Sequence, residues 1–80
     1  MTFYDFMMET FPPEKPQDNP FSDLAYDMYL DKNFPQEAVI KHEIKNYLVR
    51  ANACLECIEC FEECWKMYKK GVNHGTLDAQ

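Results

Sequence analysis

The chain has 80 residues, 46% of them hydrophobic and 15% aromatic, which is enough for one small domain and too little for two. This composition excludes an intrinsically disordered chain, because such chains have few aromatic residues and low hydrophobicity. The formal net charge of −6 would be repelled by phosphate backbones and by anionic lipids. We therefore expect no direct nucleic-acid binding and no membrane binding.

The negative charge lies in the first half of the chain. Residues 1–40 hold eight acidic and two basic side chains, whereas residues 41–80 hold six of each. The sequence has no apolar stretch near the roughly 18 residues that span a bilayer, and no basic flank typical of a signal peptide. We therefore expect a cytoplasmic protein, whose four cysteines are thiols or metal ligands rather than disulfides.

The first predicted helix spans residues 3–11. Thr2 followed by Asp5 resembles a capping box, which supplies hydrogen-bond acceptors for the first N–H groups of a helix. The apolar residues that follow at helical spacing are Phe3, Phe6 and Met7. Four prolines between residues 12 and 20 then predict a loop, because proline lacks the N–H that a continuing helix needs.

The second predicted helix spans residues 20–32. Asn19 is a favourable N-cap, and Pro20 suits the first helical position. The apolar face of this helix consists of Phe21, Leu24, Ala25 and Met28. Asn33 predicts the end of the helix, because asparagine tolerates the left-handed C-cap conformation and the following Phe34 precedes a proline.

A second apolar side of this helix carries Tyr26 and Leu30, one turn apart. We expect the helix to lie centrally in the bundle, where other helices can cover both sides. The alternative is an exposed docking surface, in which an aromatic anchor within an acidic rim would select a basic partner. The residues of this candidate interaction surface are Asp23, Tyr26, Asp27, Leu30 and Asp31.

Two further helices are predicted, over residues 38–50 and 53–70. The apolar residues at helical spacing in the first of them are Ile40, Ile44, Tyr47 and Leu48. The second gathers four cysteines and several aromatic residues on one arc, and its charged residues form a solvated face on the other. Gly71 is the predicted C-cap, so residues 1–71 form the domain and residues 72–80 a flexible tail.

The apolar faces of these helices predict an all-α fold, a small four-helix bundle with a single core. The helices supply both aliphatic and aromatic residues to that core. The predicted core residues are Phe3, Phe6, Leu24, Met28, Phe34, Ile44, Leu48, Ile58, Phe61, Trp65 and Tyr68.

Five short motifs follow one another between residues 2 and 68. They are Phe3-Tyr4-Asp5-Phe6-Met7, Phe21-Ser22-Asp23-Leu24-Ala25, Asp31-Lys32-Asn33-Phe34-Pro35, His42-Glu43-Ile44 with Tyr47-Leu48, and Phe61-Glu62-Glu63-Cys64-Trp65 with Tyr68. In this order they resemble the YozE-like family of short bacterial proteins. The resemblance implies a SAM-like (sterile alpha motif) four-helix bundle in a bacterial or phage cytoplasm, and it implies no enzymatic activity. Two features depart from the family pattern: Ala38-Val39 stands where the family usually has polar capping residues, and the family does not usually carry the set Cys54, Cys57, Cys60 and Cys64.

The cysteines follow the pattern Cys54-x-x-Cys57-x-x-Cys60-x-x-x-Cys64. This spacing matches a bacterial iron–sulfur run, but Trp65 stands where that run has proline. Free cysteines on an apolar helix face pack as small hydrophobic residues, so we predict a structural role with no cofactor and no metal. A zinc site on Cys57, Cys60 and Cys64, completed by another chain, is one alternative, and a redox role is another.

No catalytic centre is predicted from the two histidines. His42 has Glu43 beside it, but consecutive helix residues do not face one another, and His74 lies in the predicted tail. We therefore predict a non-catalytic domain that binds another protein. The alternatives are an acidic decoy, which blocks a basic nucleic-acid-binding surface of its partner, and a zinc or redox protein that uses the cysteines.

Overall fold

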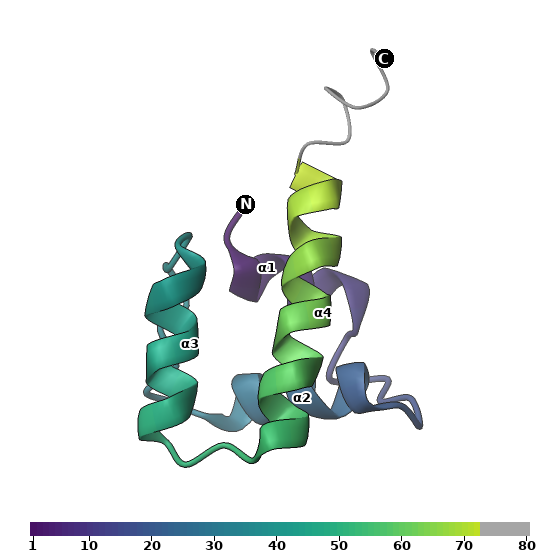
Figure 1. Cartoon of the computed structure of the whole chain (residues 1–80). Coiled ribbons are helices and arrows are strands. Elements are labelled where there is room, and N and C mark those ends of the chain that lie inside the picture. The colour runs from purple at the N-terminus through teal and green to yellow at the C-terminus, as the bar shows by residue number, and fades with distance from the viewer. Residues whose placement is uncertain (73–80) are drawn as a thin grey trace.

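The structure is a computed structural model that describes residues 1–72, and the predicted flexible tail falls almost wholly outside these residues. Within them it contains four α-helices and no strand, so the predicted all-α class is confirmed. The helices are α1 (Phe3–Thr10), α2 (Pro20–Leu30), α3 (Lys41–Arg50) and α4 (Leu55–Val72). The long helix α4 packs against each of the other three, and α1 also packs on α2 (Figure 1).

The starts of α1 and α2 are set by local side chains, as the sequence predicts. The Thr2 hydroxyl accepts a hydrogen bond from the Asp5 backbone N–H at 3.1 Å. The Asn19 side-chain oxygen accepts one from the Ser22 N–H at 2.8 Å. Ser22 in turn is buried and accepts a hydrogen bond from the Gln17 N–H at 2.8 Å, which ties the proline-rich loop to the helix.

The predicted left-handed cap at Asn33 is wrong. Helix α2 ends at Leu30, and Asp31 follows in an extended conformation with φ −84° and ψ 104°. The Asp31 carboxylate accepts a hydrogen bond from the Asn33 N–H at 2.9 Å. Such an Asx turn reverses the chain without a positive φ. Asn52, with φ 61°, is the one non-glycine residue with positive φ in the described part of the chain.

Both later helices have boundaries that differ from the predicted ones. Helix α3 begins at Lys41, because Ala38 is buried in the preceding loop, where its N–H donates to the Pro35 carbonyl at 3.2 Å. Helix α4 continues through Gly71, so the predicted C-cap is wrong. A Cβ added at Gly71 would lie 3.6 Å from Phe6 Cε1, which is an ordinary van der Waals contact. The packing around Gly71 therefore gives the helix no reason to end there.

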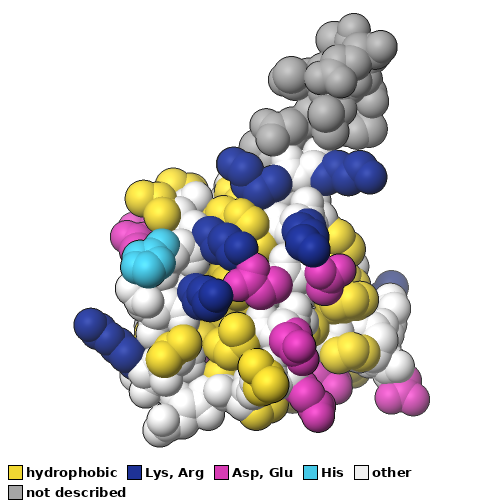
Figure 2. All heavy atoms as spheres, viewed as in Figure 1, with side chains coloured by type: hydrophobic (Ala, Val, Ile, Leu, Met, Phe, Trp, Pro, Cys, Tyr) yellow, Lys and Arg dark blue, Asp and Glu magenta, His cyan; other side chains and the backbone are white. Residues whose placement is uncertain are grey.

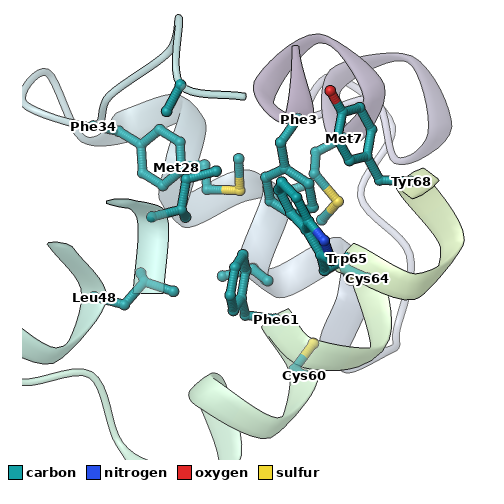
Figure 3. Close-up of a cluster of buried hydrophobic side chains, with 14 residues drawn as sticks. Phe3, Met7, Met28, Phe34, Leu48, Cys60, Phe61, Cys64, Trp65 and Tyr68 are labelled. Atoms are coloured by element: carbon teal, nitrogen blue, oxygen red, sulfur yellow. The ribbon is translucent and has the colours of Figure 1, made fainter. Parts of the chain in front are cut away.

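The core is centred on Phe3, which is fully buried. Its ring centroid lies 5.3 Å from that of Phe61, 5.4 Å from that of Trp65 and 5.6 Å from that of Tyr68, so one residue of α1 contacts three aromatic residues of α4 (Figure 3). Of the predicted core residues, Phe6 and Ile58 are only half-buried and pack against the core from outside. The others are buried: Phe3, Leu24, Met28, Phe34, Ile44, Leu48, Phe61, Trp65 and Tyr68.

Candidate interaction surface

The outer face of α2 is exposed to solvent. Tyr26 is 41% exposed, Tyr29 55% and Leu30 57%, with the exposed carboxylates of Asp23 and Asp27 on the same helix. The expectation of a central α2 is therefore wrong. Its helix contacts are made with α1 and α4, and α3 packs on α4 alone, so one side of α2 has no covering helix. Tyr29 is not among the predicted surface residues, although it adjoins Leu30.

A groove of about 390 Å³ opens between α2, the end of α3 and the start of α4. Its apolar lining comes from core residues, among them Leu24, Met28, Phe34 and Leu48. Polar and sulfur atoms also line it: Asp27, Asp31, Tyr47, Cys54 and Cys57. The site thus combines residues of three helices that are far apart in the sequence.

Asp27 is the residue shared by the hollows on this side of the molecule. A smaller hollow of about 180 Å³ adjoins the groove and adds Asp23 and Glu56 to the lining. A third, of about 510 Å³, lies between α2 and the proline-rich loop and is lined by Pro13, Asp23, Tyr26 and Asp27, among others. A partner side chain could therefore approach the carboxylates of α2 from either flank of the helix.

Asp31 differs from the other residues of the predicted surface because it is held inside the fold. Its Oδ2 accepts a hydrogen bond from the Tyr47 hydroxyl of α3, and its Oδ1 accepts the Asn33 N–H. The hydrogen bond to Asp31 raises the pKa of Tyr47, and burial and the negative charge of Asp31 add to the effect. Asp31 therefore joins α2 to α3, and it is Asp23 and Asp27 that face the solvent.

The ion pairs found within residues 1–72 lie on α3 and α4 and leave the carboxylates of α2 without a cationic partner. Glu62 pairs with Lys41 and, at 2.9 Å, with Lys45, and the hydrogen bonds from these two lysines lower the pKa of Glu62. Lys66 pairs with Glu63 at 3.0 Å. Figure 2 shows basic side chains over the upper part of α4 and toward α3, with most of the acidic side chains on this face below them.

The cysteines divide into two pairs with different environments. Cys60 and Cys64 are buried, as their predicted packing role requires, and the Cys60 thiol donates to the Pro20 carbonyl at 3.4 Å. Burial raises the pKa of the Cys64 thiol. Cys54 is exposed and precedes α4, so its predicted place on the apolar helix face is wrong, and Cys57 is half-buried. In the described residues, no group of three or more His, Cys, Asp and Glu side chains is arranged to hold a metal ion.

His42 takes no part in this surface. His42 lies exposed on α3, and His74 lies outside the described residues. None of the helices in residues 1–72 is both long and apolar enough to cross a membrane.

The sequence profile of the YozE SAM-like fold matches residues 2–70 of the chain. The chain belongs to the YozE SAM-like family. This confirms the predicted resemblance and the SAM-like fold that it implies. No solved structure matches the chain.

Members of the YozE family in several bacteria are similar to this chain over nearly their whole length. A UPF0346 protein of Bacillus velezensis is 36% identical, over 91% of this chain and 96% of its own. The UPF0346 protein YozE of Bacillus subtilis is 34% identical, over 92% and 96%. One from Lactiplantibacillus plantarum is 28% identical, over 84% and 89%. The names of these relatives state no activity and no partner.

Proposed function

We propose that this YozE-family chain is a non-catalytic protein-interaction domain, which binds a basic surface of another protein through the outer face of α2. The observation that carries the proposal is the exposure of Tyr26, Tyr29 and Leu30 beside Asp23 and Asp27, which form no ion pair within residues 1–72. An exposed apolar cluster with a polar rim is typical of a surface that a partner covers.

The two kinds of side chain have separate roles in this binding. Tyrosine buries a large apolar area when it is covered and still offers a hydroxyl to the partner, which makes it frequent among the residues that dominate interface energies. The carboxylates of Asp23 and Asp27 attract a basic surface over several ångströms and so raise the rate of association. We therefore expect Tyr26 and Tyr29 to determine how long the complex lasts, and the two aspartates to determine how fast it forms.

In the adjoining groove, Tyr47 is unsuited to act as a general base. Two of its ionisable residues, Tyr47 and Asp31, are hydrogen-bonded to each other, and the raised pKa of Tyr47 keeps this hydroxyl protonated near neutral pH. A general base must lose its proton near the working pH, which this tyrosine does not do. The four cysteines are free thiols, consistent with a cytoplasmic location.

Partner capture with matched variants tests the proposal. Tagged wild-type chain, Tyr26→Ala and the double variant Asp23→Lys with Asp27→Lys are compared by cross-linking in the source cell, and folding is checked by circular dichroism. Losing a central interface tyrosine costs about 2 kcal/mol, or about a thirty-fold weaker Kd, so the partner should be largely lost with Tyr26→Ala. The charge reversal should abolish capture.

Lys69→Glu with Lys70→Glu is the control, because it reverses the same number of charges at the far end of α4 and leaves α2 unchanged. It should retain the partner. If all folded variants capture the same proteins in the same amounts, α2 is not the binding surface and the proposal is wrong.

The acidic-decoy hypothesis uses the same surface but a narrower class of partner. It is favoured by the concentration of negative charge in residues 1–40, which would imitate a phosphate backbone. Adding a duplex oligonucleotide during capture distinguishes the two hypotheses. Displacement of the chain by the duplex indicates a decoy, whereas capture that is insensitive to the duplex indicates a different basic surface.

A further inference from the structure

Two of the four cysteines are open to reagents from the solvent. Cys54 is exposed and Cys57 half-buried, and both line the groove and the smaller hollow beside it. Cys60 and Cys64 are buried among core residues, and the Cys60 thiol is engaged with the Pro20 carbonyl. Any reaction with a small solute therefore begins at Cys54 or Cys57.

The backbone places these two cysteines at disulfide distance. The Cys54 carbonyl accepts a hydrogen bond from the Ile58 N–H at 3.0 Å, so Cys54 stands directly before the first turn of α4 and Cys57 within that turn. Residues three apart in helical geometry have Cα atoms about 5 Å apart. Disulfides need about 4.4–6.8 Å, so the pair can be bridged without moving the helix.

Cys57 and Cys60 are also three residues apart, but they are less suited to a bridge. Both lie inside α4, where the helix fixes the direction of each Cβ, and the Cys60 thiol points to Pro20. Cys54 lies directly before the helix, two residues after Asn52, whose φ is 61°. Its side chain is therefore free to turn toward Cys57.

We propose that Cys54 and Cys57 form a reversible dithiol–disulfide couple that exchanges with low-molecular-weight disulfides. The Cys54 thiol loses its proton to water, and the resulting thiolate attacks one sulfur of the small disulfide, whose S–S bond breaks and releases one thiolate. The Cys57 thiol then loses its proton to water and attacks Cys54 Sγ, which releases the second thiolate. The two released thiolates take up the two protons, so that in sum two protein thiols are oxidised to one disulfide and one small disulfide is reduced to two thiols.

The environment of each thiol sets the order of the two steps. Burial raises the pKa of Cys57, and the thiols of Cys54 and Cys60 and the carboxylate of Asp27 raise it further. Cys57 therefore stays protonated during the first step, and the exposed Cys54 is the thiol that attacks the small disulfide. The exchange does not rest on the proposed function, because it needs neither a partner protein nor Tyr26.

Disulfide mapping on the whole protein tests the proposal. The folded chain is incubated with oxidised glutathione and then unfolded in denaturant, so that alkylation blocks the buried thiols as well as the exposed ones, and the protein is cleaved after glutamate. Cleavage after Glu56 and Glu59 places Cys54, Cys57 and Cys60 on separate peptides. We expect the Cys54 and Cys57 peptides to be joined, with Cys60 and Cys64 alkylated. A bond between Cys57 and Cys60, a lasting glutathione adduct on Cys54, or four alkylated cysteines would overturn the proposal.

Three serine variants test the assigned roles. Cys57→Ser should stop at a single glutathione adduct on Cys54, and Cys54→Ser should slow oxidation on the order of tenfold, because exchange rates depend on access to the thiol. Cys60→Ser keeps a donor for the Pro20 carbonyl and should leave the yield of the disulfide unchanged. If Cys54→Ser is oxidised as fast as the wild type, Cys54 is not the entering thiol and the proposal is wrong.

Discussion

Replacing Phe3 by alanine removes the residue on which the contact between α1 and α4 depends. Its ring is fully buried and lies within 5.3–5.6 Å of three aromatic rings of α4, measured between centroids. Truncating a buried aromatic residue costs about 3–5 kcal/mol, because the loss of buried area and the cavity left behind add together. A domain of this size has a total stability of about 4–12 kcal/mol, so Phe3→Ala should remove a large part of it.

Urea unfolding, followed by the fluorescence of the single tryptophan, measures this loss. Trp65 lies 5.4 Å from the Phe3 ring, so its emission reports on the same part of the core. In a thermal melt, each kcal/mol of lost stability lowers the melting temperature of a domain of this length by about 4–8 °C, so Phe3→Ala should lower it by about 12 °C or more.

Phe6→Ala is the matched control, because Phe6 lies one turn along the same helix and is only half-buried. Its loss should cost about 2 kcal/mol or less, since less apolar area returns to water. If Phe3→Ala is no more destabilising than Phe6→Ala, the core is not centred on Phe3 and the packing argument is wrong.

Three further changes test the local features of the fold. The hydrogen bond to Asp31 raises the folded-state pKa of Tyr47, so the stability that this bond supplies is complete below about pH 10 and is lost as the pH rises further. Thermal melts of Tyr47→Phe should therefore show less destabilisation at alkaline pH than melts of the wild type. Asn19→Ala should lower the free energy of unfolding by about 1 kcal/mol in urea, through loss of the α2 cap, and an unchanged value would contradict that role. Gly71→Ala should raise the free energy of unfolding in urea by about 0.5–1 kcal/mol, because alanine favours a helix more than glycine does and its Cβ would lie in ordinary contact with Phe6. A left-handed cap at this position would make the same change destabilising.

Features that depend on residues close together in the sequence could be predicted from it. The caps at Thr2 and Asn19 each join a side chain to an N–H three residues later, so the local order of residues is sufficient. The existence of four helices follows from apolar periodicity in the same way. The cap at Asn33 was wrong because a second local interaction, the Asx turn of Asp31, ends α2 earlier.

The exposure of α2 depends on which helices pack beside it, and its two-sided apolar pattern fits a central helix equally well. The tertiary structure decides this point: α1 and α4 pack against α2, and no helix covers Tyr26, Tyr29 and Leu30. The groove has the same origin, because it joins Asp27 of α2 to Tyr47 of α3 and to residues at the start of α4.

For the cysteines, the spacing determined only that four thiols lie within about three helical turns. Their separation into a buried pair and an accessible pair was decided by the start of α4 at Leu55 and by the packing of Pro20 against Cys60. Local order thus determined where the helices begin, whereas contacts between distant segments decided which side chains the solvent reaches, because burial depends on neighbours that the local sequence does not specify.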